Sequence, residues 1–446
     1  MSKKIFGVWI SILSLMTQMV NAQDVMPLSA QQAVDYAMKN SVAVKNALLD
    51  VRIQEQTNQE ITSSALPQLS GKASITDYIK IPTSQLPGEI IGKPGTYVPV
   101  KFGTKYNTSA GFELSQLLFD GQVFIGLQAR DASLRMINMQ KEVTAEQIAV
   151  NVQKVYYQLV VGEKQVTSLD ANITRFEKLL NDTKEIFKNG FAEKLDVDKV
   201  TVQLNNMQTE RLKVQNQIDA GYAGLKFLMN MPQQQRIMLT DTMAVNDIAA
   251  NLEDTSYSYE NRNDYKFLQT IKELNNFNIR RHKLSYLPTV ALFASFTTNA
   301  QRSKFDIFSA QPWYNTAPVG LNISIPIFDG FARRSRVNKA KLELQKTDNN
   351  IEQLRANIDR DVTQSRLNLR SALLTMENQQ RNMVLAEKVY NTVKLKYEQG
   401  LGSNQEIYNA QTELRVAQNN YYSSMYDAIN ARLDYLKAIG QTPFYK

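Results

Sequence analysis

The fold is decided by residues 148–187, IAVNVQKVYYQLVVGEKQVTSLDANITRFEKLLNDTKEIF. Mostly apolar residues recur there at alternating steps of four and three positions: Ile148, Val152, Val155, Leu159, Gly162, Val166, Leu169, Ile173, Phe176, Leu180, Thr183 and Phe187. This spacing is the seam of a coiled coil, and no proline interrupts it. The stretch therefore predicts a long helix that packs along its length against a partner.

The same seam occurs again 210 positions later in the chain. Its members are Ile358, Val362, Ser365, Leu369, Ala372, Met376, Gln379, Met383, Ala386, Tyr390, Val393 and Tyr397. The two long helices, predicted at 122–189 and 331–399, end at Gly190 and Gly400, where glycine can close a helix in the left-handed conformation. Return helices are predicted at 195–229 and 405–439. We therefore predict one long helical hairpin in two copies.

Strand patterns precede each long helix. A predicted helix at 28–65, with Ser29 as its N-cap, ends at Leu66-Pro67, and a second at 265–286 ends at Leu287-Pro288. After each proline the apolar period changes to two, at 69–78, 106–117, 290–297 and 319–326. The last segment predicts an apolar strand face of Val319, Leu321, Ile323 and Ile325. The connections 79–105 and 299–314 are predicted to be exposed loops.

The pattern divides the chain into four parts. Residues 1–22 carry Lys3, Lys4 and an apolar stretch ending in Val20-Asn21-Ala22, which predicts a cleaved signal peptide and export. Residues 23–232 form the first structural repeat, 233–263 a polar connector, and 264–446 the second repeat.

Composition restricts the class of protein. With 43% hydrophobic and 21% charged residues, a chain of 446 residues is expected to fold. The net charge of +8 is not concentrated in one long block, so no nucleic-acid partner is expected. There is no cysteine and one histidine, His282, which we expect at the surface and not as a ligand. We predict no catalytic residue, no metal site and no cofactor, and hence no enzyme.

Two charged groups have alternative interpretations. Glu193, Asp196 and Asp198 could be catalytic carboxylates, but acidic residues in a first helical turn also favour the positive end of the helix dipole. Arg333, Arg334 and Arg336 follow the fourth strand and either meet lipid headgroups or are solvated.

The strand count predicts an oligomer, because four strands cannot enclose a lumen and a membrane-spanning sheet must have no free edge. The predicted fold class is mainly α with a small β part. It consists of twofold-repeated long antiparallel helical hairpins that form an α-helical tunnel, and four strands per chain that several copies pool into a transmembrane β-barrel.

This order of elements resembles the outer-membrane efflux (TolC-like) family over nearly all of the chain after residue 22. The most specific matches are Leu66-Pro67, Leu287-Pro288, Phe328-Asp329-Gly330 and the tip from Tyr397 to Leu401. The resemblance implies a homotrimer in the outer membrane that extends into the periplasm and conducts substrates passively. It also implies a periplasmic adaptor and an inner-membrane pump or secretion ATPase as partners. The alternative is a periplasmic coiled-coil adaptor or structural rod without a pore.

The resemblance also suggests functional positions. Glu406 and Asn409 lie where relatives carry two tunnel-constricting acidic residues, and Asp196 is the counterpart of Glu406 in the first repeat. Gly402 lies where some relatives carry a basic latch residue, so that latch is in doubt. Adaptor contact is expected at the tips, which comprise Gly190, Phe191, Tyr397, Gly400, Leu401 and Gly402.

Overall fold

The computed structural model describes residues 25–241, 256–306 and 311–442. Two compact units are present. The helical unit takes in the chain up to Asp50, Asn138–Phe267 and the chain from Ile351 onward; the sheet unit takes in Val51–Ile137 and Leu268–Asn350. The predicted signal peptide at 1–22 lies outside the described residues. These two units do not coincide with the two predicted sequence repeats, and the division into repeats stays a prediction.

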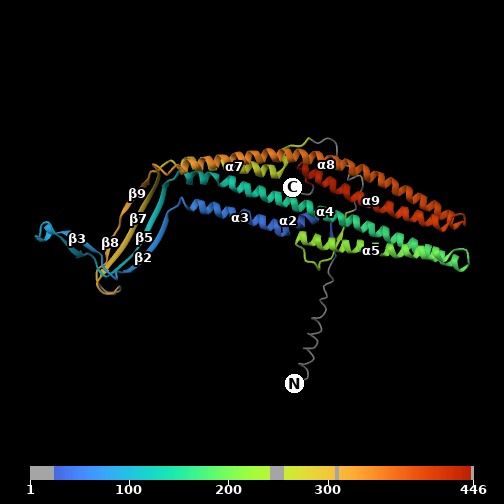
Figure 1. Cartoon of the computed structure of the whole chain (residues 1–446), viewed down its shortest axis with the longest axis horizontal. Helices are drawn as coiled ribbons and strands as arrows, with labels where there is room; N and C mark the ends of the chain where they lie inside the picture. Colours follow the sequence, from blue (N-terminus) through green and yellow to red (C-terminus); the bar gives the residue numbers. More distant parts are fainter. Residues whose placement is uncertain (1–24, 242–255, 307–310, 443–446) are drawn as a thin grey trace, which may run out of the picture. The chain divides into compact units, whose positions relative to one another are not determined.

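Two long helical hairpins dominate the chain (Figure 1). Helix α4 (Gly121–Lys188) has 68 residues and returns as α5 (Lys194–Met229). Helix α8 (Ala332–Glu398) has 67 residues and returns as α9 (Asn404–Ala438). All four were predicted to within two residues, and they make the protein mainly helical.

The predicted seam is the core of the helical unit. Val152, Leu159, Leu169 and Phe176 of α4 are almost completely buried. A Cβ atom added at Gly162 would lie 3.1 Å from Cγ1 of Ile218, so glycine at this seam position lets α5 pack closely. The last seam residue, Phe187, remains exposed because α4 ends one residue later, before α5 has begun.

Both tips close as predicted. Gly190 and Gly400 have positive φ angles of 79° and 73°. The following residues, Phe191 and Leu401, donate backbone hydrogen bonds of 3.0 and 2.9 Å to carbonyls five residues earlier. This pattern is the Schellman motif, which satisfies the carbonyls at the end of a helix.

The first helix was predicted to be continuous over residues 28–65, and this is wrong. Helix α2 (Ala30–Asn40) begins at Ser29, which forms the predicted N-cap together with Gln32, and it ends at Ser41. Helix α3 (Val42–Ser63) then starts anew. Ser41 has an extended ψ of 133°, which breaks the helical path. The corresponding helix of the second half, α7 (Asn263–Leu284), is continuous as predicted.

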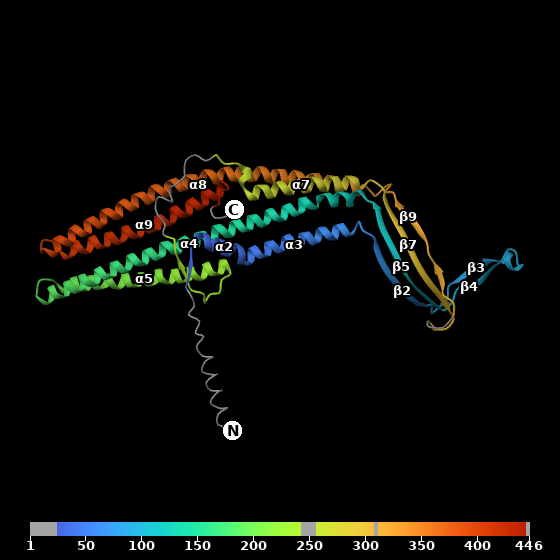
Figure 2. The ribbon, with the colours of Figure 1, turned by 180° about the vertical axis from the view of Figure 1, so that it is seen from behind.

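The sheet unit contains an antiparallel sheet in the order β2, β5, β7, with β8 and β9 both pairing with β7 (Figure 2). The strands are β2 (Gln68–Asp77), β5 (Tyr106–Phe119), β7 (Thr289–Arg302), β8 (Tyr314–Thr316) and β9 (Val319–Ser324). All four predicted strands are present: β9 corresponds to the fourth, predicted at 319–326, whereas the short strand β8 precedes it and was not predicted. Pro318 separates β8 from β9, because proline has no N–H for the ladder.

Ile325 was predicted to belong to the fourth strand, and this is wrong. Strand β9 ends at Ser324, which pairs with Thr289. The next pair would join Ile325 to Pro288, which cannot donate a backbone hydrogen bond, and Pro326 restricts the conformation of Ile325.

Two short pairings were missed in segments predicted to be irregular. Strands β3 (Thr83–Pro87) and β4 (Tyr97–Lys101) form an antiparallel hairpin within the predicted loop 79–105, closed by the 3-10 helix η2 (Gly88–Ile91). Strands β1 (Met26–Leu28) and β6 (Ile237–Leu239) pair in parallel.

The described ends of the predicted connector pack on the helical unit. Its 3-10 helix η3 (Tyr259–Asn261) lies beside α8, and the hydroxyls of Tyr257 and Tyr259 donate to Asp359 Oδ1 at 2.7 and 2.9 Å. Arg262 donates to the carbonyls of Lys437 and Ala438 at the end of α9, at 3.3 and 3.2 Å. Residues 242–255 lie outside the description.

Gly121→Ala is expected to lower the free energy of unfolding by ~1–3 kcal/mol, the usual cost of overpacking. A Cβ atom at Gly121 would lie 2.7 Å from Cβ of Leu284. Gly224→Ala is the matched control, because the space around that helical glycine is open and alanine is the better helix former. Thermal unfolding followed by circular dichroism measures both; equal stability of the two variants would contradict the packing.

Candidate functional site

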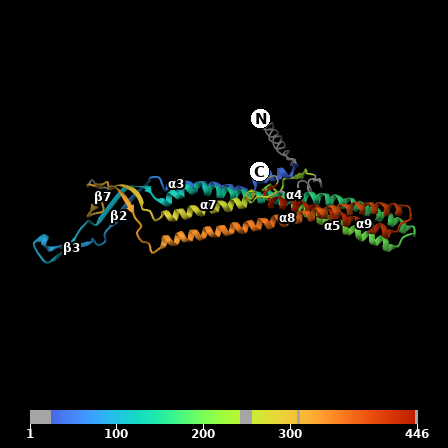
Figure 3. The ribbon, with the colours of Figure 1, turned by 90° about the horizontal axis from the view of Figure 1, so that it is seen from above.

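The tips of the two hairpins lie side by side at one end of the helical unit (Figure 3). Polar pairs join them within one chain. Thr183 Oγ1 of α4 donates to Asn404 Oδ1 of α9 at 3.5 Å, and Lys178 Nζ lies 4.0 Å from Glu398 Oε1. The tips therefore form one connected surface.

Further polar pairs join the hairpins above the tips. Gln203 of α5 donates to the Tyr408 hydroxyl at 2.6 Å, Asn172 of α4 donates to Gln418 at 2.7 Å, and Arg415 of α9 lies 3.4 Å from Glu210. These contacts were not predicted from the sequence. The one weak signal for a polar contact between the hairpins is Thr183, a polar residue in an otherwise mainly apolar seam.

Tyr397 connects the two tips from the second hairpin. Burial raises the pKa of the Tyr397 phenol, the Thr183 hydroxyl lowers it, and the charges of Asp182 and Asp196 raise it further. Thr183 and Asp182 belong to α4 and Asp196 to α5, so Tyr397 on α8 lies on the side of the first hairpin.

Asp196 has a structural role at the start of α5. Its Oδ2 atom accepts a hydrogen bond of 3.4 Å from the backbone N–H of Glu193, and the Glu193 side chain caps the helix in return. Glu193 and Asp196 therefore act as helix-start residues, which is one of the two interpretations of the acidic group Glu193, Asp196 and Asp198.

Glu406 occupies the equivalent position of α9 but is less constrained. Ser403 caps this helix, accepting from the Glu406 backbone N–H at 3.2 Å. Within the described part of the chain, the Glu406 carboxylate has no hydrogen bond or ion pair, and its side chain is exposed. Asn409, one turn further on, is exposed and accepts a hydrogen bond of 2.8 Å from Gln405.

The tip residues differ in their exposure. Phe191 and Leu401, the residues that follow the two closing glycines, are large apolar side chains with 87% and 78% of their surface exposed. Gly402 packs tightly, because a Cβ atom there would lie 3.1 Å from the backbone nitrogen of Tyr397. The sequence has no basic latch residue at this position, and the turn leaves little space for one.

The register of the sheet places apolar side chains on one face. Residues directly opposite each other in antiparallel strands lie on the same side of a sheet. One such row joins Leu69, Leu114, Ala294 and Val319 across the four strands, and Leu292 pairs with Leu321 and Val290 with Ile323. Much of this face is exposed, including Leu69, Leu321 and Ile323. An exposed apolar face of this kind marks an interaction surface.

The opposite face of the sheet is more polar. On it Lys72 of β2 forms an ion pair with Glu113 of β5, and the hydroxyls of Ser74 and Ser109 lie 2.8 Å apart. Asn322 and Ser324 of β9 belong to this face by register. The sheet therefore has one apolar face and one more polar face, and both extend across four strands.

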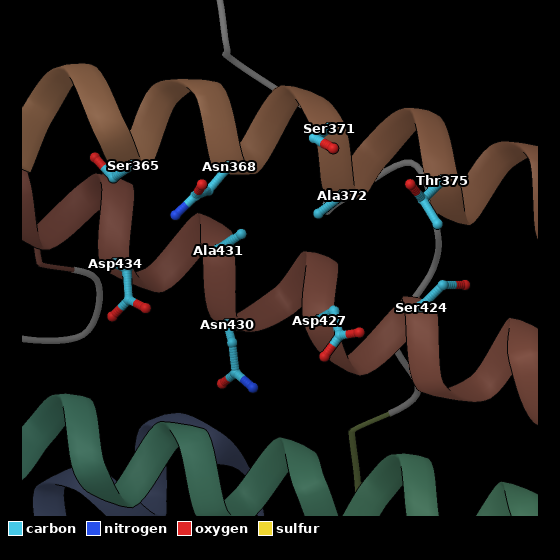
Figure 4. Close-up of a pocket in the computed structure, with 10 residues that line it drawn as sticks. All are labelled: Ser365, Asn368, Ser371, Ala372, Thr375, Ser424, Asp427, Asn430, Ala431 and Asp434. Atoms are coloured by element: carbon cyan, nitrogen blue, oxygen red, sulfur yellow. The ribbon is translucent and has the colours of Figure 1, made fainter.

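A cavity of about 400 Å³ lies between α8 and α9 in the helical unit (Figure 4). Polar residues of both helices line it, namely Ser365 and Asn368 of α8 and Asp427, Asn430 and Asp434 of α9, and the three α9 side chains point away from α8. Asp434 is occupied by an ion pair with Lys154 of α4 at 2.6 Å. The lining has no histidine or other evident base paired with a nucleophile.

No cluster of three or more histidine, aspartate or glutamate side chains that could hold a metal ion occurs among the described residues. In the same part of the chain, no helix is both long enough and apolar enough to cross a bilayer.

Comparison with known proteins gives concordant matches. The chain is 18% identical to the Vibrio cholerae outer membrane protein TolC, over 74% of this chain and 76% of the relative. It is 21% identical to the proteases secretion protein PrtF of Dickeya chrysanthemi, over 60% of each chain. Among solved structures, the chain resembles CusC with a TM-score of 0.73 and 16% identity, covering 92% of this chain and 91% of the other.

The fold is therefore that of the outer-membrane tunnel proteins. Residues 274–441 match the family model of the outer membrane efflux proteins, and the chain is similar to TolC-like proteins. The protein is located in the outer membrane and extends into the periplasm. The family is one of transport channels and not of enzymes.

Gly400→Val is expected to loosen the second tip, because the left-handed conformation costs an L-residue ~1–2 kcal/mol. A Cβ atom would meet nothing within 4 Å, so the effect is one of backbone strain and not of collision. Gly400→Asn is the control, since asparagine tolerates this conformation better. Limited proteolysis should cut the valine variant faster at the tip; equal cleavage of both variants would contradict the strain argument.

Proposed function

We propose that three copies of this chain form an outer-membrane channel-tunnel that passively conducts substrates exported by a tripartite efflux pump or a type I secretion system. The four strands of each copy join a shared transmembrane β-barrel, and the long hairpins form a periplasmic tunnel. Each copy follows the predicted twofold repeat.

The observation that carries this proposal is the open sheet. Strand β2 has ten residues, all exposed, and pairs only with β5 among the described strands. The other edge, β8 and β9, pairs only with β7. A long open edge invites pairing with another chain, and in a bilayer every backbone group must be bonded. Pairing of β2 with the β8–β9 edge of a neighbouring copy satisfies both edges.

The apolar face supports the same arrangement. Strands of about 9–11 residues, tilted in a barrel, span the hydrocarbon core. Val319, Leu321 and Ile323 share their face with apolar residues of β7, so this face meets lipid and the face of Asn322 lines the lumen. Ile325 follows the strand and lies near its end.

The tips supply the docking end. Exposed apolar side chains at Phe191 and Leu401, held by rigid glycine turns, form a surface suited to a periplasmic adaptor. The adaptor and its inner-membrane pump or ATPase provide the energy. The family description supports efflux, and the name of the PrtF relative supports secretion.

The gate is proposed at the start of α9. Threefold symmetry would turn Glu406 into a ring of three carboxylates, with Asn409 one turn above it and Asp196 as its counterpart in the first repeat. A ring of acidic side chains in a pore attracts cations. The capping bond of Asp196 makes it the smaller contributor, whereas the free carboxylate of Glu406 can reach the lumen.

Leu321→Arg is expected to impair trimer assembly, because arginine on the lipid face near the midplane costs ~2–4 kcal/mol. Asn322→Arg, one position along the same strand, is the matched control and should assemble normally. Membrane fractionation followed by mass measurement of the detergent-extracted protein tests both. A soluble monomeric wild type would favour the alternative of a periplasmic adaptor or rod without a pore, and equal assembly of both variants would exclude the proposed strand faces.

Glu406→Gln is expected to weaken cation selectivity and block by multivalent cations, because it removes the charge of the proposed ring. Asp196→Asn should have a smaller effect, and the double variant the largest. Single-channel conductance in planar bilayers, with a multivalent cation on the periplasmic side, measures the difference. If the double variant behaves as the wild type, the gate lies elsewhere.

A further inference from the structure

The junction between the sheet and the helices carries an exposed apolar collar. It is formed where α7 leads into β7 and where β9 leads into α8, by Tyr286, Leu287, Ile325, Ile327, Phe328 and Phe331. Ile327 and Phe328 have 92% and 74% of their surface exposed. The collar continues the apolar face of the sheet toward the helices, so it lies where that face ends.

One member of the collar is held at a conformational cost. Phe331 has a φ of +68°, in the left-handed region that disfavours residues with a side chain. Its ring is exposed and packs edge-on against Phe328, with 5.5 Å between the centroids. Strained residues point to a functional requirement. An exposed aromatic pair suits a membrane–water interface, where aromatic side chains gather.

Next to the collar lies a group of basic side chains, here called the basic patch: Arg280, Arg281, Lys283, Arg334, Arg336 and Lys339. They belong to the last turn of α7 and the first two turns of α8, and all are exposed. Lys339 is 3.9 Å from Glu343. Among the described residues, Arg281, Lys283, Arg334 and Arg336 have no carboxylate partner, so their charges are available.

The end of α7 and the start of α8 lie close together in the sheet unit. The Arg333 guanidinium lies 6.0 Å from the ring centre of Tyr286, which joins the start of α8 to the end of α7. Burial lowers the pKa of His282 on α7, the neighbouring charges of Arg281, Arg336 and Lys339 lower it further, and the Glu343 carboxylate opposes them. Basic residues of both helices therefore lie near His282, with one carboxylate among them.

The patch is not a general feature of such junctions in this chain. The corresponding corner of the first repeat, Phe119-Asp120-Gly121, is followed by no lysine or arginine before Arg130, the counterpart of Lys339, and Arg130 donates hydrogen bonds to the Leu127 carbonyl and the Thr62 hydroxyl. Helix α3 ends at Ser63 and has no basic residue in its last turn. Solvation of a helix end would apply equally to both repeats, so it does not account for basic residues in one of them.

We propose that the basic patch binds anionic phospholipid headgroups at the periplasmic surface of the outer membrane. This inference rests on the proposed function, which places the sheet in the bilayer. At ~1.5 Å per residue, Arg334 and Arg336 lie within about 6 Å of the start of α8. The interfacial zone on each side of the hydrocarbon core is ~5–8 Å deep, so these side chains reach the headgroups.

The test compares Lys283→Gln/Arg334→Gln/Arg336→Gln with the control Lys199→Gln/Arg370→Gln/Lys388→Gln. The control removes the same charge from exposed positions on α5 and α8 far from the sheet. Each full-length protein is reconstituted in phosphatidylcholine with phosphatidylglycerol, extracted, and examined for retained lipids by native mass spectrometry. Wild type and control should retain phosphatidylglycerol preferentially; the patch variant should lose this preference by on the order of 100-fold, the effect expected of three basic residues near an anionic surface.

Equal retention by the patch and control variants would overturn the inference. Displacement of the lipid by inorganic phosphate alone would also overturn it, since the patch would then be a general anion site. Single-channel conductance of the patch variant should be normal. Failure of the wild type to form a channel would reject the proposed function, whereas normal conductance with unselective lipid retention rejects only this inference.

Discussion

The unpaired backbone edge of β2 is the constraint on which the rest of the molecule depends. Ten consecutive residues present N–H and C=O groups that β5 satisfies on one side only. The apolar face of the same sheet adds a second requirement, because it is exposed and is built from side chains of four strands. Water satisfies the edge and disfavours the face, whereas a bilayer does the reverse. The proposed pooling of strands within lipid would satisfy both.

The helical unit depends on a different constraint, which is the packing of its seam. A seam that repeats every 3.5 residues keeps one side of α4 against its neighbours from Ile148 to the tip, so the tip does not depend on isolated helix stability. Close packing at Gly162 and the capped starts of α5 and α9 fix the return helices in register. Polar pairs such as Asn172–Gln418 then join one hairpin to the other.

Most of this architecture could be predicted from the sequence, because its signals are long and repeated. The seams, glycine tips and alternating strands extend over many residues, and each was located to within a few positions. The break at Ser41, the β3–β4 hairpin and the separate strand β8 before Pro318 depend on single residues or on tertiary pairing, which no period reveals. For the candidate site, the sequence located the helix tips and the acidic residues beside them, but not which carboxylate is free of hydrogen bonds. The roles of these residues in docking and at the gate stay predictions.

The two halves of the chain share one pattern of elements but differ in the chemistry placed on it. At the helix starts after the tips, Asp196 closes a capping box, whereas Ser403 performs the capping in the second half and leaves the Glu406 carboxylate unbonded. At the sheet junctions, the corner at Phe119 is followed by no arginine before Arg130, whereas the corner at Phe328 is followed by Arg333, Arg334 and Arg336. Both differences concern side chains outside the seams, where packing leaves the choice of residue open.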